Sequence, residues 1–599
     1  MRSCGIWITA VVAVSSVTGL AIPPKRYQCQ NGVCTQTPLS ITSSSGSSLR
    51  ICQLTCGDGS LWPKPTQQMK LGSTVQAVNV ASIPHSISFG DGASAPSALV
   101  VAMQGVFLDL VQSKATECTL TSVEDTPLSI SATIKTSKET LSMETDESYS
   151  LTIDLTKTST PIAITAASLF GYRHALMTLS QLVEYDDISH SMYIVASAVI
   201  RDAPAFAHRG LALDTSRNFY SVPALKRVLD GMGATKLNTF HWHMTDTHSF
   251  SVEIIGEPRL TQYGAYSARQ VYTQAEVRAL VRYGKARGIR IVPELDAPAH
   301  VGAGWTWGPE ANLGDLVVCY DHDPWMEACV EPPCGQLNPR NPNIFPILTT
   351  IYTEFNALFE SDVFHMGGDE VHVGCWNSSA LVTAGMKSRQ KRDFLDLWAA
   401  FQQQVLDSLH EMAPTKKAML WSSDLTNVAT IDKYLDPSDY IIQIWDATTV
   451  EGEPTKIAAQ LAKKGFHVVL SNYDKWYLDC GGGNWLSNGT SWCDPYKSWQ
   501  HIYDVDLFQD MPSRMTKYVL GGEVALWAEM ADEYAAEVKL WPRAAAAAER
   551  LWSNPTTTTW KEAVPRLLTQ RRRIVEMGIH ADALQPQWCM DNPTRCTLL

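Results

Sequence analysis

The run His208-Arg209-Gly210-Leu211-Ala212-Leu213 begins a series of short apolar segments that continues into the last quarter of the chain. Helical patterns separate many of these segments, at residues 221–233, 273–287, 388–410, 455–464 and 533–552. The other apolar segments lie at 238–243, 289–294, 363–366, 418–421, 440–445, 467–471 and 518–523. Eight strands alternating with helices predict an α/β fold, a (β/α)8 TIM barrel whose active site lies at the carboxyl ends of the strands.

The chain ahead of this series has a different composition. From about residue 70 to 200 it contains alternating runs rich in Thr, Ser and Val, with a helical stretch at 164–184. Such alternation is typical of half-buried strands. We therefore expect three regions, which are a signal peptide at 1–21, a smaller α+β domain with a Cys-rich start at 22–205, and the barrel catalytic domain at 206–599.

The first 21 residues have the pattern of a secretory signal. Arg2 precedes an apolar run from Ile6 to Leu20, and small residues lead to a cleavage site after Ala21. The run is too short and interrupted to span a bilayer, and no later stretch reaches about 18 apolar residues. We expect a cleaved signal peptide and a secreted, extracellular protein without a membrane partner. A lysosomal location and an N-terminal anchor are the alternatives.

The composition favours a neutral ligand. Of 599 residues, 45% are hydrophobic and 18% are charged, so the chain can bury a large core. With 48 basic and 61 acidic residues the net charge is −13, which argues against nucleic acid or an anionic membrane as the main partner. The 19 Trp residues are unusual. Because indoles stack on flat apolar faces and keep an N–H to donate, they favour a sugar as the substrate.

The cysteines agree with secretion. Cys4 falls in the signal region, and twelve of the other thirteen lie in four close groups that lack a CxxC zinc pattern. This spacing indicates disulfide-stapled loops in an oxidising compartment. Cys118 remains, as a predicted buried free thiol. Asn377 and Asn488 begin N-glycan acceptor motifs.

Polar and aromatic side chains recur at the carboxyl ends of the predicted strands, where a barrel presents its site. In chain order they are Asp214, Arg217, His241, His243, Asp246, Glu294, Asp296, His300, Asp369, Glu370, Trp421, Trp445, Tyr477, Asp479, Trp527 and Glu529.

The sharpest motif is Phe364-His365-Met366-Gly367-Gly368-Asp369-Glu370, in which a strand runs through two glycines into adjacent acids. The glycines permit a tight turn. Two acids facing one pocket repel each other, so we expect the pKa of one to rise, as suits a general acid. A helix N-terminus that attracts acids is the alternative for this segment.

Adjacent acids do not suit the common retaining glycosidase, whose two carboxyl groups stand about 5 Å apart on opposite sides of the scissile bond. They fit the division of labour of the known substrate-assisted exceptions to that arrangement. The substrate's own 2-acetamido oxygen attacks the anomeric carbon, one carboxylate orients and stabilises that amide, and the other protonates the leaving oxygen.

The motif series resembles that of glycoside hydrolase family 20, whose members are β-N-acetylhexosaminidases. The resembling segments lie in the family's order at 210–217, 240–246, 293–300, 365–370, 476–479 and 549–553. The Cys-rich start and the Cys319 to Cys334 loop look most like the secreted arthropod enzymes that degrade chitin oligosaccharides. The resemblance implies an exo-acting, retaining, substrate-assisted enzyme that needs no cofactor or metal and removes terminal β-linked GlcNAc or GalNAc.

The resemblance also implies roles for individual residues. Glu370 would be the general acid/base, Asp369 would hold the acetamido nitrogen, and Tyr477 would hydrogen-bond the acetamido oxygen. His300 and Asp246 would orient the acid pair. The remaining pocket residues would wall the sugar (Trp421, Trp445, Trp527) and bind its hydroxyl groups (Arg217, Asp479, Glu529).

A second sugar would be held by two Cys-rich loops. Their rims would carry Trp485 and Trp492 on one loop, and Trp325, Val330 and Glu331 on the other. We expect disulfides 329–334, 319–375, 480–493 and 589–596, and two bridges among Cys29, Cys34, Cys52 and Cys56. Dimers are common among the resembling proteins, so a homodimer is a further expectation.

Two other functions compete with this one. His241 and His243 point the same way on a strand, as in metal-dependent amidohydrolases, and Asp246 and His300 could complete a shell. The later strand ends lack the Lys and His that would finish a binuclear site, which favours a packing role for these histidines. A catalytically inactive carbohydrate-binding protein would also explain the tryptophans, but Asp369 and Glu370 are both present.

Overall fold

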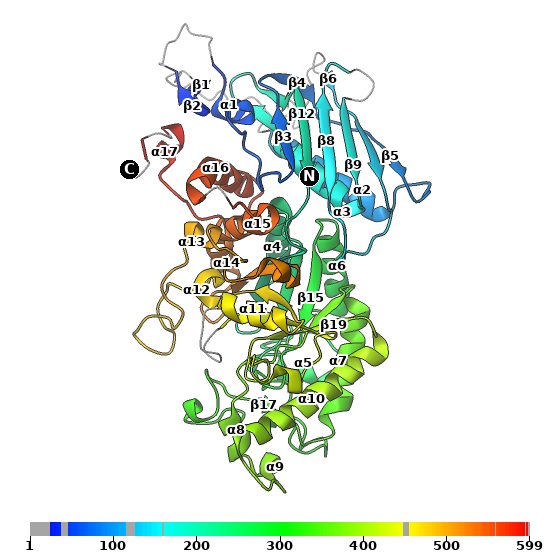
Figure 1. Cartoon of the computed structure of the whole chain (residues 1–599), viewed down its shortest axis with the longest axis vertical. Coiled ribbons are helices and arrows are strands. Elements are labelled where there is room, and N and C mark those ends of the chain that lie inside the picture. Colours follow the sequence, from blue (N-terminus) through cyan, green and yellow to red (C-terminus); the bar gives the residue numbers. More distant parts are fainter. Residues whose placement is uncertain are drawn as a thin grey trace, which may run out of the picture.

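The computed structural model describes residues 24–37, 46–115, 126–157, 161–446, 454–556, 559–592 and 595–596. The predicted signal peptide and Cys118 lie outside these residues. The N-terminal part packs against one end of a barrel (Figure 1). Its elements are β1 (Tyr27–Gln30), β2 (Val33–Gln36), α1 (Leu49–Thr55), β3 (Gln68–Leu71), β4 (Val75–Asn79), β5 (His85–Phe89), α2 (Ala98–Gln112), β6 (Thr126–Pro127), β7 (Ile130–Ile134), β8 (Tyr149–Asp154), β9 (Ile162–Ala166), α3 (Leu169–Gln181), β10 (Val183–Asp186), β11 (Ser191–Val195) and β12 (Ser197–Asp202).

The N-terminal part is an α+β arrangement of two main sheets. The larger sheet has the order β3-β12-β8-β9-β7-β5, and the smaller has the order β10-β11-β4-β6. Buried and exposed positions alternate along β8, β9 and β12, so one face of the larger sheet joins the core with α2 and α3.

The helix predicted at 164–184 is wrong at both ends. Its first residues belong to β9, which pairs with β7 and β8, and its last two belong to β10. The helix begins after Ser168, whose hydroxyl accepts the Gly171 N–H as an N-cap. Sheet pairing therefore overrides the helical pattern on either side of α3.

The second part is a closed barrel of parallel strands, as predicted. Its order follows the chain, and each expected strand is present within one to three residues of its predicted bounds. All eight strands are buried on both faces except at their ends, as a parallel barrel requires. They are β13 (His208–Asp214), β14 (Thr239–His243), β15 (Arg290–Glu294), β18 (Val363–His365), β19 (Lys417–Trp421), β20 (Tyr440–Ile444), β21 (His467–Leu470) and β22 (Val519–Leu526).

Helices surround the barrel, and a small two-stranded sheet, β16 (Val317–Val318) with β17 (Gln336–Leu337), lies in the long connection after β15. The helices are α4 (Val222–Thr235), α5 (Arg259–Gly264), α6 (Gln274–Lys285), α7 (Ile344–Leu358), α8 (Val373–Ser378), α9 (Ala380–Thr383), α10 (Lys391–Met412), α11 (Pro454–Lys463), α12 (Tyr473–Trp476), α13 (Trp499–Tyr503), α14 (Glu533–Leu540), α15 (Arg543–Ser553), α16 (Trp560–Glu576) and α17 (Gln587–Asp591), with short 3₁₀ turns η1 (Trp325–Glu327), η2 (Ile431–Lys433) and η3 (Ser513–Tyr518).

The single helix predicted at 533–552 is wrong, because two helices occupy this segment. α14 ends before Trp541, whose backbone is extended, and α15 begins after Pro542. Proline has no N–H to donate and disfavours the helical conformation of the residue before it. Pro542 therefore divides the pattern into α14 and α15.

Buried ion pairs join the two parts. Glu147 of the N-terminal part accepts two bonds from Arg209 of β13, at 3.0 and 2.7 Å, and lies 2.7 Å from His174. Lys236, after α4, donates to Asp202 at 3.0 Å. Removing one partner of such a buried pair would leave an uncompensated charge, so the pairs hold the two parts in one arrangement. A domain boundary between residues 205 and 206, as proposed from the sequence, would lie in the link between β12 and β13.

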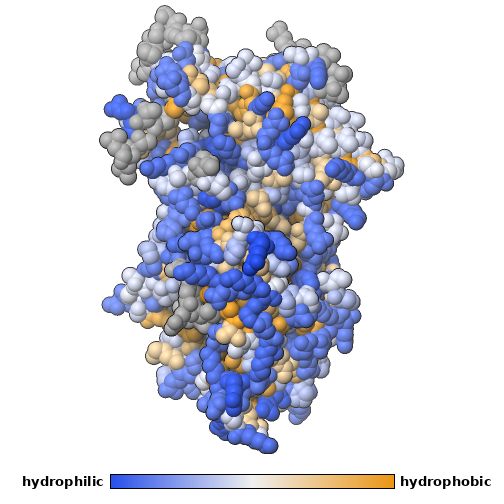
Figure 2. All heavy atoms as spheres, in the orientation of Figure 1, coloured by the Kyte–Doolittle hydropathy of each residue, from blue (hydrophilic) through white to orange (hydrophobic). Residues whose placement is uncertain are grey.

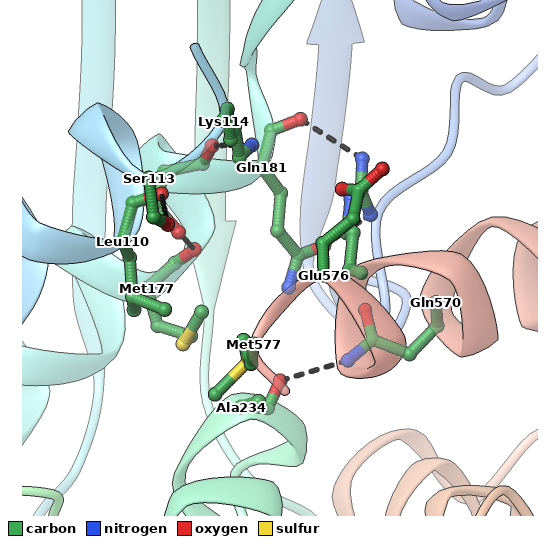
Figure 3. A pocket seen from close by; sticks show the side chains of 11 residues that line it. Leu110, Ser113, Lys114, Met177, Gln181, Ala234, Gln570, Glu576 and Met577 are labelled. Carbon is green, nitrogen blue, oxygen red and sulfur yellow. Dashed lines mark hydrogen bonds between the residues drawn. The ribbon is translucent and has the colours of Figure 1, made fainter. Parts of the chain in front are cut away.

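A small cavity of about 30 Å³ lies in the same interface. Figure 3 shows Lys114 and Met177 from the N-terminal part on one side and Gln570 and Met577 from the barrel part on the other. On the barrel side, the Gln570 side chain of α16 donates to the Ala234 carbonyl of α4 at 3.2 Å. A cavity of this volume admits only a few water molecules, so it is too small for a sugar.

The predicted disulfides are confirmed. The structure contains 319–375, 329–334, 480–493 and 589–596, and the two bridges among the first four cysteines join Cys29 to Cys56 and Cys34 to Cys52. Disulfides persist in oxidising compartments, so they indicate a protein of the secretory pathway.

Figure 2 shows hydrophilic residues over much of one face, with hydrophobic residues in smaller groups between them. Within the described ranges, no helix combines the length and the apolar character needed to cross a bilayer.

Candidate active site

A two-glycine turn after β18 presents the adjacent acids. Gly367 and Gly368 both have positive φ, of 62° and 83°. A Cβ on Gly367 would lie 1.8 Å from Oδ1 of Asp296, so a side chain has no room there. The Gly368 N–H donates to the same Oδ1 at 2.8 Å. Asp296, which follows β15, thus holds the turn that carries Asp369 and Glu370.

The two acids have different surroundings. Asp369 is almost fully buried, and within the described residues its Oδ1 has no hydrogen-bond partner. Burial, helped by the neighbouring Glu370 and opposed by His300, raises the pKa of Asp369 to about 6. The predicted pKa rise within the pair therefore falls on Asp369. The carboxylate of Glu370 is partly exposed and lies 3.3 Å from Nε2 of His300.

An arm of charged side chains leads from Glu370 to Arg217. Nδ1 of His300 lies 3.4 Å from Oδ2 of Asp246, and Nη2 of Arg217 lies 3.0 Å from the same oxygen. Burial alone would lower the pKa of His300, but Asp246 and Glu370 raise it well above its ordinary value. His300 is therefore a cation between two carboxylates.

Aromatic rings form a wall beside the acids. Trp445 stacks nearly parallel to Tyr477, with 6.4 Å between ring centres and 12° between planes. Trp527 meets Tyr477 at 6.0 Å and Trp421 at 5.9 Å. These four residues follow or end four different strands or their loops, yet the barrel brings them together as predicted.

Arg217 contacts several of the other charged side chains in the site. Besides Asp246 it contacts Asp214 at 3.3 Å and Glu331 at 2.7 Å, and its guanidinium lies 5.4 Å from the Trp527 ring centre. The backbone N–H of Trp527 donates to Oδ1 of Asp479 at 3.4 Å.

Burial raises the pKa of Asp479 to about 6 and that of Glu529 well above its ordinary value. The positive charge of Arg217 opposes this rise in the Glu529 pKa, so the Arg217 guanidinium and the Glu529 carboxylate interact electrostatically. The predicted hydroxyl-binding residues therefore share one side of the site.

The loop closed by the 329–334 disulfide borders this site. A cleft beside Glu370 and His300 is lined by Val330 and Glu331 of this loop. The Val330 side chain is 46% exposed, whereas Trp325 is half-buried and packs against the main core. Val330 and Glu331 thus line the cleft, and Trp325, which precedes this loop in the chain, is less exposed than Val330.

The loop closed by the 480–493 disulfide forms a second border. Trp492 is 63% exposed and meets Trp445 at 6.2 Å, Tyr477 at 6.3 Å and Tyr473 at 5.1 Å between ring centres. Trp485 is 44% exposed on the same loop. Trp492 therefore extends the aromatic wall outward into solvent.

Comparison with known proteins decides the family. The model described as "Glycosyl hydrolase family 20, catalytic domain" matches residues 206–555, which is more than half of the chain, and a "beta-acetyl hexosaminidase like" model matches 61–182. The chain belongs to glycosyl hydrolase family 20. It is therefore a glycoside hydrolase of the β-N-acetylhexosaminidase type.

Relatives from this family cover nearly the whole chain. The "Chitooligosaccharidolytic beta-N-acetylglucosaminidase" of Ostrinia furnacalis is 41% identical over 585 residues, which are 95% of each chain. The protein of the same name from Bombyx mori is 39% identical over 99% of this chain and 100% of that one. Among solved structures, a Flavobacterium johnsoniae chitobiase is 27% identical with a TM-score of 0.68, covering 87% of this chain and 73% of that chain.

The strand histidines of this family 20 chain face carboxylates on both sides. His243 lies 2.6 Å from Glu294 through Nδ1 and 3.1 Å from Asp246 through Nε2. His241 lies 2.7 Å from Glu523 and 2.9 Å from Glu294. His243 therefore donates from both ring nitrogens, whereas His241 donates to Glu523 through Nδ1 and its Nε2 has no hydrogen-bond partner among the described residues. These contacts agree with the packing role that we expected.

The sequence patterns assign no role to His365 and Glu523, although the structure places both in this network. The sequence signal that could have found His365 and Glu523 is an ionisable residue within a barrel strand of otherwise apolar residues. Parallel barrel strands are buried on both faces, so such a residue must find partners across the barrel.

Proposed function

We propose that this family 20 protein is an exo-acting β-N-acetylglucosaminidase that removes terminal, non-reducing β-linked GlcNAc from chitooligosaccharides with retention of configuration. The observation that carries the proposal is the unpartnered, buried Oδ1 of Asp369 beside Glu370. Buried acceptors are normally hydrogen-bonded, and the acetamido N–H of the substrate could donate to this oxygen. The names of the Ostrinia and Bombyx relatives support the substrate class.

The reaction has two steps. Asp369 accepts the acetamido N–H and Tyr477 donates to the acetamido oxygen, which attacks the anomeric carbon while the glycosidic bond breaks. Glu370 gives its proton to the leaving oxygen, so an oxazolinium ring and a free aglycone form. Glu370 then takes a proton from a water that opens the ring at the anomeric carbon, which restores the acid and retains configuration.

The surrounding side chains bind one sugar. Trp421, Trp445 and Trp527 wall the acetyl group and the pyranose face, and Arg217, Asp479 and Glu529 bind the hydroxyl groups by charge-assisted hydrogen bonds. His300 and Asp246 orient Glu370. Side chains that bind the hydroxyl groups of one terminal sugar support exo action.

Inhibition and chelation test the substrate-assisted mechanism together. A thiazoline analogue of GlcNAc should inhibit strongly, because it copies the bicyclic intermediate. Exhaustive dialysis against EDTA should leave the initial rate on an aryl GlcNAc unchanged. Loss of activity on chelation that zinc restores would contradict the proposal, as would weak thiazoline binding by an active protein.

We propose that the second sugar stacks on Trp492, with Val330, Glu331, Trp485 and Trp325 completing the rims of the two disulfide loops. An exposed indole that continues the aromatic wall supports this. Trp492→Ala should raise KM for chitooligosaccharides about five- to tenfold, since a stacking contact of about 1 to 1.4 kcal/mol corresponds to that factor.

Trp492→Ala has two controls, which are a small substrate and a variant of a second exposed tryptophan. KM for a small aryl GlcNAc, which does not reach the rim, should hardly change. Trp588→Ala removes a similarly exposed indole, 55% accessible and on α17, and should leave both KM values unchanged. Equal losses for both substrates in Trp492→Ala would make this indole structural.

We propose a secreted, extracellular location, because chitooligosaccharides are met outside the cell and six disulfides suit that compartment. A homodimer stays a prediction, which the molar mass measured by light scattering would test.

A further inference from the structure

A row of alternating charges runs through the barrel toward the acids. It passes from Glu523 to His241, then to Glu294, His243 and Asp246, with successive contacts of 2.7, 2.9, 2.6 and 3.1 Å. All of these side chains are buried. Beyond Asp246 the row continues through the His300 and Glu370 arm described above. Glu294, at the end of β15, is the central member and lies behind the sugar site.

Each oxygen of Glu294 has its own partners. Oε2 faces nitrogens of His241 and His243, and Oε1 accepts the indole N–H of Trp421 at 2.8 Å. Nδ1 of His365 also lies 3.2 Å from Oε1, but that nitrogen accepts the Gly367 N–H at 3.0 Å and so brings a lone pair. Trp421 is therefore the donor that satisfies Oε1.

The charge states agree with this assignment. Burial opposes ionisation of Glu294, but the neighbouring histidine cations, chiefly His243, hold its pKa well below the ordinary value. Burial would lower the pKa of His241, but Glu523 and Glu294 raise it to about 9. Burial lowers the pKa of His365 to about 4, as suits a ring that accepts from Gly367. Glu294 is thus an anion between two cations and an indole.

We propose that Glu294 is a positioning residue that fixes the plane of the Trp421 indole in the acetamido pocket and, through His243 and Asp246, steadies the arm that ends at Glu370. This inference rests on the proposed function, because it assigns the task of Trp421 to the acetyl group. Trp421 is 127 residues from Glu294, is almost fully buried, and meets Trp527 and His365 on its other sides. Its indole N–H bond to Oε1 therefore decides how the ring faces the pocket.

The Glu294→Gln variant probes this directly. A carboxylate accepts at both oxygens, whereas an amide accepts at one position and donates at the other. The NH2 group of the introduced amide would therefore face either the indole N–H of Trp421 or the N–H groups of His241 and His243, and two donors cannot form a hydrogen bond. We expect kcat/KM on an aryl GlcNAc to fall about 100-fold, and Trp421→Phe, which loses the indole N–H, to lose about tenfold.

A double-mutant cycle separates positioning from general damage. In the Glu294→Gln background the added loss from Trp421→Phe should shrink to less than twofold, because the bond it removes is already gone. Equal losses from Trp421→Phe in both backgrounds would overturn the proposal. Glu147→Gln, a buried glutamate that accepts from Arg209 far from the site, is the matched control and should leave kcat/KM within about twofold.

Inhibitor selectivity supplies the second readout. In Glu294→Gln the Kd of the GlcNAc thiazoline should rise at least 30-fold, and the Kd of an iminosugar without an acetamido group less than threefold. Equal weakening of both would overturn the proposal. If Glu294→Gln does not fold by circular dichroism, Trp421→Phe alone must still weaken the thiazoline selectively, and no change would overturn the proposal. Failure of the unaltered protein to bind the thiazoline would instead reject the proposed function.

Discussion

Glu370→Gln should lower kcat/KM for chitooligosaccharides about 10³- to 10⁴-fold and for an activated aryl GlcNAc much less, by about tenfold. The sugar leaving group is a poor one and needs a proton from Glu370, whereas a nitrophenolate leaves without that proton. The position of Glu370, partly exposed and 3.3 Å from His300, suits a group that must reach the leaving oxygen and exchange protons with water. Steady-state rates on the two substrates measure the difference.

The activated glycoside is the internal control for this variant. If the variant keeps an unchanged KM for the activated glycoside, its sugar pocket is intact. The loss of kcat/KM on chitooligosaccharides then measures only the missing proton transfer from residue 370. Equal losses on both substrates would remove Glu370 from the acid role. His300→Asn, which removes the cation beside the acid, should give a smaller loss with the same dependence on the leaving group.

Asp369→Asn should lower kcat about 10²- to 10³-fold for both leaving groups, because it acts on the formation of the oxazolinium ring and not on departure of the aglycone. The carboxylate must be ionised to accept the acetamido N–H and stabilise the developing charge. Its pKa is raised from 3.8 to about 6, so kcat/KM of the unaltered protein should fall as the pH drops through about 6. That acid limb should be absent from the pH profile of the variant.

The same raised pKa predicts an effect on stability. The folded protein binds a proton at Asp369 more tightly than the unfolded chain does, so this group costs stability as the pH rises from about 4 to about 6 and the full penalty persists above that range. Asp369→Asn should therefore raise the free energy of unfolding at pH 7, by on the order of 3 kcal/mol at most, and have little effect at pH 4. Urea unfolding at the two pH values would measure this, and a variant less stable at pH 7 would contradict it.

The barrel was predictable because its signal is local and repeated. Each strand is a short apolar run bounded by turns, and eight of them in alternation with helices leave few other architectures. The errors fall where a neighbouring element or one residue outweighs the pattern. Residues 164–166 join β9 because β7 and β8 offer their backbone hydrogen bonds, and Pro542 interrupts an otherwise continuous helical pattern.

The candidate acids were also predictable, since Asp369 and Glu370 follow directly from one strand and two glycines. Their environments were not. The rise of the Asp369 pKa depends chiefly on how deeply the fold buries it, and then on His300 and Glu370. Adjacent acids in the sequence indicated that one pKa would rise, but only the depth of each carboxylate in the barrel decides which one.

The sequence by itself determined the order of the strands, the residues at their carboxyl ends and the local disulfide loops, because these depend on contacts within a strand, a turn or a short loop. Only the tertiary structure decided that Glu294 bonds Trp421 across 127 residues, and that Glu331 meets Arg217 across 114. Closing a barrel sets which residues on distant strands face each other, through the tilt and register of all its strands together. A hydrogen bond of 2.7 or 2.8 Å between such residues depends on that whole geometry, and no short stretch of the chain contains it.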